Sequence, residues 1–362
     1  MVDVFNHETI LLRKIILAWS HHLYFRRLEV RVSMKAGLYR EKGEARSVLH
    51  IEDVAVPQMG ADDVLIRIHT SGINPSDVKM RAGQSLGGMT MPYPEVIPHS
   101  DGAGVIEAAG DAVKGLAAGD RVYVFNAGFK RAFGTAAEML VIPAEQVRRL
   151  PDRVSFAHGA CLGIPAMTAV HAVTRAPVVE GKRVLVSGGG GVVGRYAIET
   201  ARALGAATII TTASSELSRS TAKKAGADHV LDYREANLTE AILDLSGGID
   251  HAIEAEFGVN VAMLGQVMAV NGSIAAYGSA LERTPTLPFY DFMFKNITVH
   301  MLLVYLLDRQ TRNAATDCMA KLLEDGSLTE NIAATFPLDQ IAEAHEMVEA
   351  SSKSGSVILS LA

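Results

Sequence analysis

Residues 34 to about 155 contain short runs in which apolar and polar side chains alternate. Val64–Thr70 has this alternation, which is typical of a β-strand with one buried face. Gly104–Gly110 and Asp120–Phe125 are further short apolar runs beside glycine turns, and Met34–Tyr39 has the pattern of a first strand. The pattern therefore predicts a β-rich region in this part of the chain.

From about residue 158 to residue 304, apolar runs of strand length alternate with segments of helical spacing. This alternation predicts a parallel sheet, because each strand–helix–strand crossover returns the chain in the same direction. The predicted strands are Arg183–Ser187, Thr208–Thr212, His229–Leu231, His251–Glu254 and Ser273–Gly278. Beyond them the pattern predicts helices near Ala314–Glu324 and Leu338–Ala350 and a last strand, Ser356–Ser360. The expected fold class is α/β.

A glycine-rich turn joins the first of these parallel strands to a predicted helix over Arg195–Leu204. Its glycines fit G-x-G-x-x-G, in which one glycine makes the turn, one lets the backbone approach a pyrophosphate, and one lets helix and strand pack closely. The start of the helix would add free N–H groups and a positive dipole end. The predicted dinucleotide-binding residues are Gly189, Gly191, Val192, Val193 and Gly194. A merely flexible loop would not explain the strand and helix around it.

The composition narrows the class of protein. A chain of 362 residues exceeds a typical single domain, so two domains are expected. The formal net charge of −6 argues against a general role in binding nucleic acid or membrane surfaces. Two cysteines exclude a disulfide framework and a four-cysteine zinc lobe, and they fit a reducing, cytoplasmic compartment. No apolar run reaches transmembrane length, so membrane insertion is not expected.

The first 33 residues differ from the rest of the chain. Ile10–Trp19 is amphipathic, and a basic stretch follows it. A signal peptide is one interpretation, although charges interrupt the apolar core and no small-residue cleavage site follows. A membrane-surface helix is a second interpretation. We favour a third, in which residues 1–33 form an extension outside the working enzyme and Met34 is the true start.

Several further motifs resemble those of one enzyme family. They are Gly72–Asp77, Ser100–Val105, Gly119–Val122, Gly134–Glu138, Gly163–Ala169 and Ala342–Glu346. From about Met34 to the C-terminus the chain resembles the zinc-free medium-chain dehydrogenases/reductases, and among them the quinone oxidoreductases of the zeta-crystallin type. The resemblance implies a GroES-like catalytic domain at 34–157, completed by 305–362, and a Rossmann cofactor-binding domain at 158–304. It also implies a homodimer.

The residues that match the zinc ligands of related enzymes argue against a catalytic metal. Zinc-dependent relatives have a Cys at the position of Asn74 and a His at the position of Ser100, and neither residue here is a good zinc ligand. Catalytic zinc takes three Cys, His or carboxylate ligands, whereas Asp101 stands alone and His99 is offset by one position. We therefore expect no metal. Without a Lewis acid, an already electrophilic acceptor is expected, a quinone or an activated alkene.

The end of the second parallel strand indicates the cofactor. NAD-dependent enzymes place Asp or Glu there to bond the ribose 2′-hydroxyl, but Thr211–Ser215 has no carboxylate. Ser214 and Ser215 would leave room for a 2′-phosphate and donate to it, and Arg219 or a nearby lysine would supply positive charge. NADPH is therefore the predicted cofactor. Alternatively, the two serines only cap the next helix.

Three residues are candidates for the acceptor site. Asn74 follows a strand and precedes a proline, so its amide would lie at a loop mouth and polarise a quinone carbonyl; alternatively, it bonds its own turn. Lys79 stands where relatives often have a tyrosine, and it either stabilises oxyanion charge or is a solvated helix residue. The resemblance places the Thr168 hydroxyl against the nicotinamide, with an ordinary helix threonine as the alternative. Asp77 and Arg81, four residues apart, are expected to form a structural pair.

Ligands gather at the carboxyl edge of a Rossmann sheet. The residues predicted there, with their backbone toward the carboxamide of the nicotinamide, are Tyr277, Gly278, Ser279, Met301 and Leu303.

The leading functional hypothesis is an NADPH-dependent quinone reductase that transfers a hydride or a single electron in an interdomain cleft. The enzymatic alternative is an NADPH-dependent reductase of α,β-unsaturated carbonyls, which would need an ordered proton donor. The sequence offers no convincing general acid. The non-enzymatic alternative is a nucleotide-binding structural or RNA-binding protein, which the negative net charge argues against.

Overall fold

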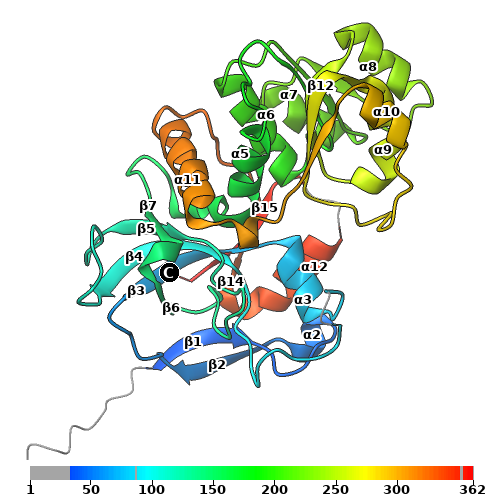
Figure 1. Cartoon of the computed structure of the whole chain (residues 1–362). Coiled ribbons are helices and arrows are strands. Elements are labelled where there is room, and N and C mark those ends of the chain that lie inside the picture. The colour runs from blue at the N-terminus through cyan, green and yellow to red at the C-terminus, as the bar shows by residue number, and fades with distance from the viewer. Residues whose placement is uncertain (1–32, 86–87, 351–353, 362) are drawn as a thin grey trace, which may run out of the picture. The chain divides into compact units, whose positions relative to one another are not determined.

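Six strands form a parallel sheet in the order β10-β9-β8-β11-β12-β13 in the computed structural model (Figure 1). They are β8 (Arg183–Val186), β9 (Thr208–Thr212), β10 (His229–Leu231), β11 (Ile249–Glu254), β12 (Met268–Ala276) and β13 (Thr298–Met301). Every neighbouring pair is parallel. Numbered from β8, the strand order is 3-2-1-4-5-6, that of a doubly wound dinucleotide-binding sheet. The predicted Rossmann sheet is therefore confirmed.

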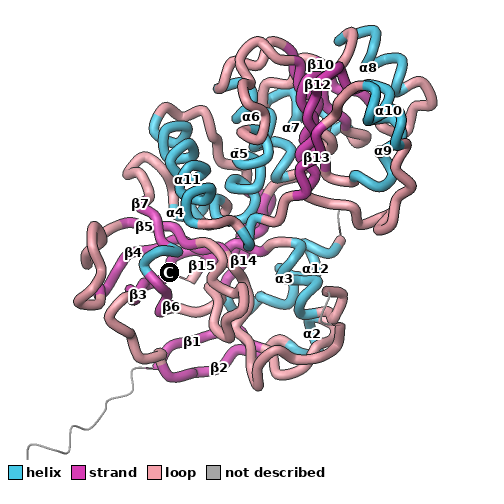
Figure 2. The backbone as a smooth tube through the Cα atoms, viewed as in Figure 1, coloured by secondary structure: helices cyan, strands magenta, loops and turns pink. Residues whose placement is uncertain are grey.

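Helices pack against both faces of this sheet (Figure 2). They are α5 (Met167–Val173), α6 (Val192–Ala203), α7 (Glu216–Lys224), α8 (Leu238–Ser246), α9 (Phe257–Val267) and α10 (Phe289–Phe294). Val184 and Val186 of β8 belong to the apolar cluster that includes Tyr196 of α6. Leu185, between them, belongs to a second cluster with Leu264 of α9. Successive side chains of β8 thus enter two different cores, which explains why this strand is apolar throughout.

A second sheet is mainly antiparallel and has the order β14-β15-β3-β4-β5-β7, with β6 also paired to β3. Its strands are β3 (Asp63–Ile73), β4 (Asp101–Ala109), β5 (Arg121–Val124), β6 (Met139–Pro143), β7 (Val147–Arg149), β14 (Ile332–Pro337) and β15 (Ser356–Ser360). β1 (Ser33–Leu38) pairs with β2 (His50–Ala55). Because β15 pairs with β3, the C-terminal segment completes the β-rich region that the sequence predicts near the N-terminus.

Within the described residues, the other α-helices connect the two sheets or cover the second one. They are α2 (Ala45–Val48), α3 (Pro75–Arg81), α4 (Phe156–Gly159), α11 (Arg309–Glu324) and α12 (Ile341–Glu349). α11 begins five residues before the predicted Ala314, because the Asp308 side chain accepts a hydrogen bond from the Thr311 N–H at 2.9 Å and caps the helix there. The sequence pattern also missed the short strands β2, β6, β7, β13 and β14.

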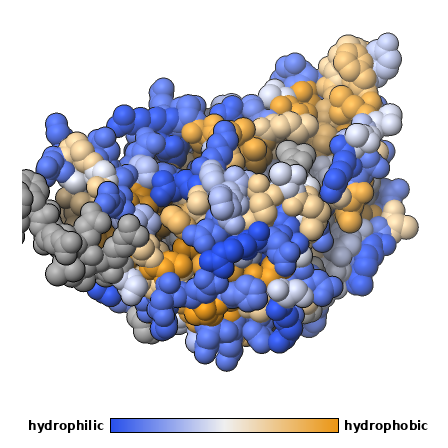
Figure 3. Space-filling model, turned by 90° about the horizontal axis from the view of Figure 1, so that it is seen from below, coloured by the Kyte–Doolittle hydropathy of each residue, from blue (hydrophilic) through white to orange (hydrophobic). Residues whose placement is uncertain are grey.

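The structure describes residues 33–85, 88–350 and 354–361. The amphipathic segment at Ile10–Trp19 lies outside these residues. Among the described helices, none is long and apolar enough to cross a membrane. On the face seen in Figure 3, hydrophilic residues predominate and smaller hydrophobic patches lie between them.

Candidate active site

The glycine turn between β8 and α6 is built for close approach. Gly188 has a φ of +69°, and Gly191 is the N-cap of α6. A Cβ on Gly194 would lie 2.3 Å from the Gly188 carbonyl oxygen, so this position must stay a glycine for the turn to close. A Cβ on Gly191 would meet only one atom within 4 Å, at 3.3 Å, so its outer side is open. The first helix turn and this open backbone suit an anionic ligand.

A cavity of about 550 Å³ lies where the carboxyl ends of β8, β11 and β12 face α3. Ten of the predicted site residues line it: Asn74, Lys79, Thr168, Gly191, Val192, Val193, Gly194, Tyr277, Gly278 and Leu303. The structure thus brings the glycine turn and the three acceptor-site candidates around one hollow.

The other predicted residues lie outside the lining of this cavity. Gly189 packs behind the turn, where an added Cβ would lie 2.1 Å from the Thr211 hydroxyl oxygen. Ser279 accepts from the Gly258 N–H at 2.9 Å, and Met301 is 69% exposed. Ser214, Ser215 and Arg219 are found after β9 and on α7.

Asn74 is held by contacts with two carboxylates. It is the N-cap of α3, and its backbone N–H donates to Asp77 Oδ2 at 2.7 Å. Its side-chain Nδ2 donates to Asp101 Oδ2 at 2.8 Å. An amide NH₂ group carries two N–H donors, so this contact orients the Asn74 amide in the cavity wall and leaves a second donor for a ligand.

Asp101 is fully buried and connects two walls of the cavity. The same Oδ2 that accepts from Asn74 accepts from the Ile164 backbone N–H at 3.0 Å. Oδ1 has no hydrogen-bond partner and faces Gly163, on which a Cβ would lie only 2.3 Å away. Burial raises the pKa of Asp101 well above its usual range, against the hydrogen bond from Asn74, which lowers it. From its sequence position Asp101 is recognisable only as an insufficient zinc ligand, and these two contacts cannot be predicted.

Thr168 also lines the cavity, after a π-helical turn at Leu162–Ala166 that contains Pro165. Its hydroxyl donates to the Ile164 carbonyl oxygen at 2.6 Å. Wide turns of this kind are frequent at functional sites. The Asp101 carboxylate therefore fixes two parts of the site. It bonds the Asn74 amide directly, and through the Ile164 N–H it holds the turn that carries Thr168.

Lys79 is exposed on α3 and reaches the edge of the cavity. Its neighbour Arg81 corrects one expectation. The Arg81 guanidinium donates to the Gly43 carbonyl oxygen and to a Glu349 carboxylate oxygen, so the predicted pair with Asp77 is wrong. The Asp77 carboxylate bonds Asn74 instead, because α3 begins with an N-terminal cap at that point.

The donor set around Asn74 does not fit a catalytic zinc ion. His99 is buried, and its ring nitrogens contact Ser71 Oγ at 2.8 Å and His345 Nε2 at 2.9 Å. Burial lowers the pKa of His99 well below its usual range. His99 is engaged in these contacts, and Asn74 and Ser100 are poor zinc ligands. Of these four residues, Asp101 is then the one good ligand, whereas catalytic zinc requires three.

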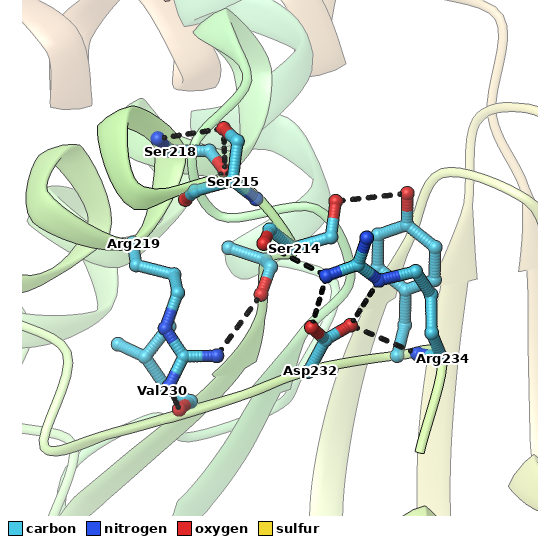
Figure 4. Close-up of polar contacts among 9 residues, drawn as sticks. Ser214, Ser215, Ser218, Arg219, Val230, Asp232 and Arg234 are labelled. Carbon is cyan, nitrogen blue, oxygen red and sulfur yellow. Dashed lines mark hydrogen bonds and ion pairs between the residues drawn. The ribbon is translucent and has the colours of Figure 1, made fainter. Parts of the chain in front are cut away.

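Two hydroxyls at the end of β9 are used within the protein. The Thr212 hydroxyl accepts from the Gly188 N–H at 3.0 Å and supports the glycine turn. Ser215 Oγ accepts from the Ser218 N–H at 3.2 Å as the N-cap of α7 (Figure 4). The capping alternative therefore describes Ser215.

Ser214 faces a different set of groups. Its hydroxyl donates to the Tyr233 hydroxyl at 3.1 Å, and its carbonyl oxygen accepts from Arg234 at 3.1 Å (Figure 4). Arg234 also bonds both carboxylate oxygens of Asp232, at 2.9 and 2.5 Å, and lowers the pKa of Asp232 to about 2. The Arg234 side chain remains 64% exposed.

Arg219 is oriented toward the sheet. Its guanidinium lies 3.3 Å from the Val230 carbonyl oxygen and 3.5 Å from that of Ala213 (Figure 4). Arg234 is thus the more exposed arginine beside Ser214, and sequence analysis missed it. The Y-R pair after β10 follows an apolar run, but nothing local shows that β10 lies beside β9.

The C-terminal segment also reaches the glycine turn. The Ser354 hydroxyl donates to the Gly190 carbonyl oxygen at 3.1 Å, and Gly355 and Ser356 line the cavity. The sequence pattern predicts only a strand here, Ser356–Ser360, and gives no sign that the residues before it reach the glycine turn.

Similarity to known proteins agrees with this arrangement. Residues 60–152 match the alcohol dehydrogenase GroES-like domain, and residues 192–321 match the zinc-binding dehydrogenase family. Human quinone oxidoreductase is 32% identical over 315 residues, which cover 85% of this chain and 92% of that protein. The chloroplastic NADPH-dependent alkenal/one oxidoreductase of Arabidopsis thaliana is 32% identical over 258 residues, covering 68% of this chain and 64% of that protein.

Solved structures share the fold. A mycobacterial quinone oxidoreductase superposes with a TM-score of 0.81 at 26% identity, covering 91% of this chain and 100% of that one. A mycobacterial structure complexed with NADPH superposes with a TM-score of 0.78, also at 26% identity, with the same coverage.

The parallel sheet, the GroES-like part and the cavity between them define an oxidoreductase of the medium-chain dehydrogenase/reductase class. Within this class, the chain belongs to the quinone oxidoreductase family. The predicted family and fold are confirmed.

Proposed function

We propose that this enzyme uses NADPH to reduce quinones without zinc, by transfer of a hydride or an electron in the described cavity. The observation that carries the proposal is the single hollow shared by the glycine turn and by Asn74, Lys79 and Thr168. A dinucleotide bound along the turn would bring its nicotinamide to these side chains and would supply the reducing equivalents.

The residues of the chain fit such a dinucleotide. The first turn of α6 presents backbone N–H groups to a pyrophosphate, and Gly191 leaves the approach to them open. The guanidinium of Arg234 stays exposed although it pairs with Asp232, and it lies beside Ser214 at the end of β9, where both side chains would donate to a phosphate. These features favour a 2′-phosphate and support the choice of NADPH.

At the other end of the cavity, the chain would bind and polarise the acceptor. The second N–H of the Asn74 amide would donate to a carbonyl oxygen of the substrate, and Asp101 would keep the amide in place. Lys79, at the edge, would favour negative charge on that oxygen. Because the donor set does not fit zinc, an acceptor that needs no Lewis acid is favoured.

Reduction of α,β-unsaturated carbonyls is the second candidate. Two relatives favour it by name: the alkenal/one oxidoreductase, and a tomato protein called 2-methylene-furan-3-one reductase that is 33% identical over 251 residues. Both reactions would use the same cavity and the same cofactor.

The test is NADPH oxidation by the purified protein with a panel of quinones and enones, each assayed with and without a strong chelator. We expect quinone turnover that the chelator leaves unchanged. If the protein reduces enones but no quinone, reduction of α,β-unsaturated carbonyls becomes the favoured function. Stoichiometric zinc together with inactivation by the chelator would overturn the metal-free site.

We also retain the domain boundaries, 34–157 with 305–362 and 158–304, and the homodimer as proposals. A group of residues on and near α10 and β13 is more than half exposed and supports self-association: Phe289, Tyr290, Phe294, Met301 and Leu303. Size-exclusion chromatography coupled to light scattering would measure the molecular mass of the purified protein in solution. A monomer at micromolar concentration would contradict the dimer.

A further inference from the structure

Tyr305, the first residue after the proposed Rossmann domain, brings a phenol into the acceptor end of the cavity. It follows β13 in a single 3₁₀ turn, Val304–Leu306, and it lines the cavity. Its hydroxyl donates to Ser76 Oγ at 2.7 Å, and Ser76 is on α3, two residues after Asn74. The ring stacks on Phe129 with the centroids 4.9 Å apart. The Tyr305 side chain is therefore fixed at two points, by the stacking of its ring and by the hydrogen bond of its hydroxyl.

We propose that Tyr305 is a catalytic hydrogen-bond donor, which turns from Ser76 to the carbonyl oxygen of the acceptor. This inference rests on the proposed function and adds a second donor beside Asn74. A phenolic hydroxyl rotates about one bond, so it can exchange one acceptor oxygen for another without moving the ring. The Ser76 contact keeps the hydroxyl satisfied while no substrate is bound.

The electrostatic surroundings keep this phenol in its donor form. Burial raises the pKa of Tyr305, and the nearby charges of Asp77 and Asp101 raise it further. The hydrogen bonds with Ser76 and Ser100 act in the opposite direction. The hydroxyl therefore keeps its proton at neutral pH, as a donor to an oxyanion must.

The other hydroxyls and amides nearby are less suited to this task. The Thr168 hydroxyl donates to the Ile164 carbonyl oxygen, and one N–H of Asn74 is taken by Asp101. Lys79 is exposed to solvent. Tyr305 therefore adds a donor at a partly buried position, where a hydrogen bond to developing charge is stronger than in water.

The step balances without loss of the Tyr305 proton. A bound reduced nicotinamide dinucleotide would supply a hydride to the acceptor, and an electron pair of the acceptor would then move onto its carbonyl oxygen. Tyr305 and Asn74 donate hydrogen bonds to that oxygen. Water then protonates the product anion. The Tyr305 O–H bond stays intact, in keeping with its raised pKa.

Two variants separate this role from a merely structural one. Tyr305→Phe removes the donor and keeps the ring that stacks on Phe129. Ser76→Ala removes the same Tyr305–Ser76 hydrogen bond but leaves the phenol. Tyr93→Phe, at a tyrosine outside the cavity lining and outside the patch proposed for self-association, is the matched control and should keep wild-type kinetics.

We expect Tyr305→Phe to lower kcat/KM for the acceptor about 100-fold, as removal of an oxyanion donor does, with unchanged NADPH affinity. Ser76→Ala should lose far less. Equal losses in both variants would show that the contact is only a bridge between α3 and the turn after β13. Wild-type kinetics in Tyr305→Phe would also overturn the proposal.

Calorimetry makes the test independent of turnover. Quinone binding is measured on protein saturated with NADP⁺, which cannot reduce it. Tyr305→Phe should weaken this binding about fivefold, the value of one net hydrogen bond, whereas Ser76→Ala should not. If the wild-type protein turns over no acceptor, the proposed function fails, but the binding comparison still decides the role of Tyr305. Equal quinone affinity in Tyr305→Phe and the wild type would refute it.

Discussion

The two ends of the cavity region are held in different ways. At the acceptor end, Asp101 joins Asn74 and Ile164, which are 27 and 63 residues away in the sequence, and all these contacts are buried or nearly so. At the end of β9, Ser215 bonds a residue three positions away, and Arg234 bonds one two positions away. The acceptor end is fixed mainly by buried long-range contacts. The end of β9 is fixed mainly by exposed contacts, several of them short-range.

This difference predicts how each end responds to mutation. A buried carboxylate with several partners leaves unpaired donors when it is removed, so its loss spreads to every group that it positions. Exposed pairs contribute little to stability. Changes at the end of β9 should therefore alter cofactor choice and spare the fold, whereas changes at Asp101 should damage both fold and turnover.

The largest effect is expected for Asp101→Ala. The variant leaves the Asn74 Nδ2–H and the Ile164 N–H without their acceptor. We expect a loss of about 3 kcal/mol in the free energy of unfolding, since each buried unpaired donor costs about 1–3 kcal/mol. Quinone turnover should fall at least about 100-fold, because Asn74 loses its orientation.

Chemical denaturation and steady-state kinetics measure these two losses. Asp152→Ala is the control, because Asp152 is fully exposed and lies 3.8 Å from Arg121. A stable Asp101→Ala protein with wild-type kinetics would show that the acceptor end does not depend on the buried carboxylate.

The contrast between local and distant contacts also explains what the sequence could predict. The β8–turn–α6 unit depends on neighbours in the chain, and residue types and spacing predicted it. The capping role of Ser215 is also local, and the sequence offered it as the alternative interpretation. Tyr305 reaches Ser76 across 229 positions, and Arg81 reaches Glu349 across 268. No periodicity encodes such pairs.

The edge strands give a second reason. β13 and β14 are short, and each has residues exposed to solvent, so their sequences lack the apolar runs that mark buried strands. The role of Asp101 was also hidden, because its partners come from α3 and the π-helical turn. Only their packing together shows that one carboxylate serves both.

At the end of β9, the largest effect is expected for Ser214→Asp. A carboxylate at this position would repel a 2′-phosphate and would offer the ribose hydroxyls of NADH an acceptor. We expect NADPH affinity to fall by more than about tenfold, or 1.4 kcal/mol, while NADH binds more tightly. Fluorescence titration with both cofactors measures the ratio. The midpoint of thermal unfolding should stay near the wild-type value, and an unchanged cofactor ratio would contradict the predicted 2′-phosphate site.

A smaller effect is expected from the two arginines beside that strand. Arg234→Ala removes an exposed charge next to Ser214, whereas Arg219→Ala removes one whose guanidinium faces backbone carbonyls. We expect Arg234→Ala to weaken NADPH binding about fivefold to tenfold, less than a buried charge-assisted hydrogen bond contributes, because Arg234 is exposed. NADH binding should be unaffected. Arg219→Ala should have the weaker effect on NADPH. The reverse order, in the same titrations, would restore Arg219 as the main phosphate ligand.

The smallest effect, on stability alone, is expected from Asp77→Asn and depends on pH. Burial raises the pKa of Asp77 to about 7, above the value of about 3.9 for an unfolded chain. The folded state therefore holds this proton more tightly, and the stability it contributes is complete below about pH 4 and lost as the pH rises toward 7. Asn cannot ionise and can still accept from the Asn74 N–H, so the variant should gain roughly 1 kcal/mol on the wild type for each pH unit between pH 5 and 7. Denaturation across this range measures the difference, with Asp111→Asn, at an exposed carboxylate, as a flat control. A difference that is constant with pH would show that Asp77 is already ionised in the folded protein, and the acceptor end would then contain a buried charge that the Asn74 N–H stabilises.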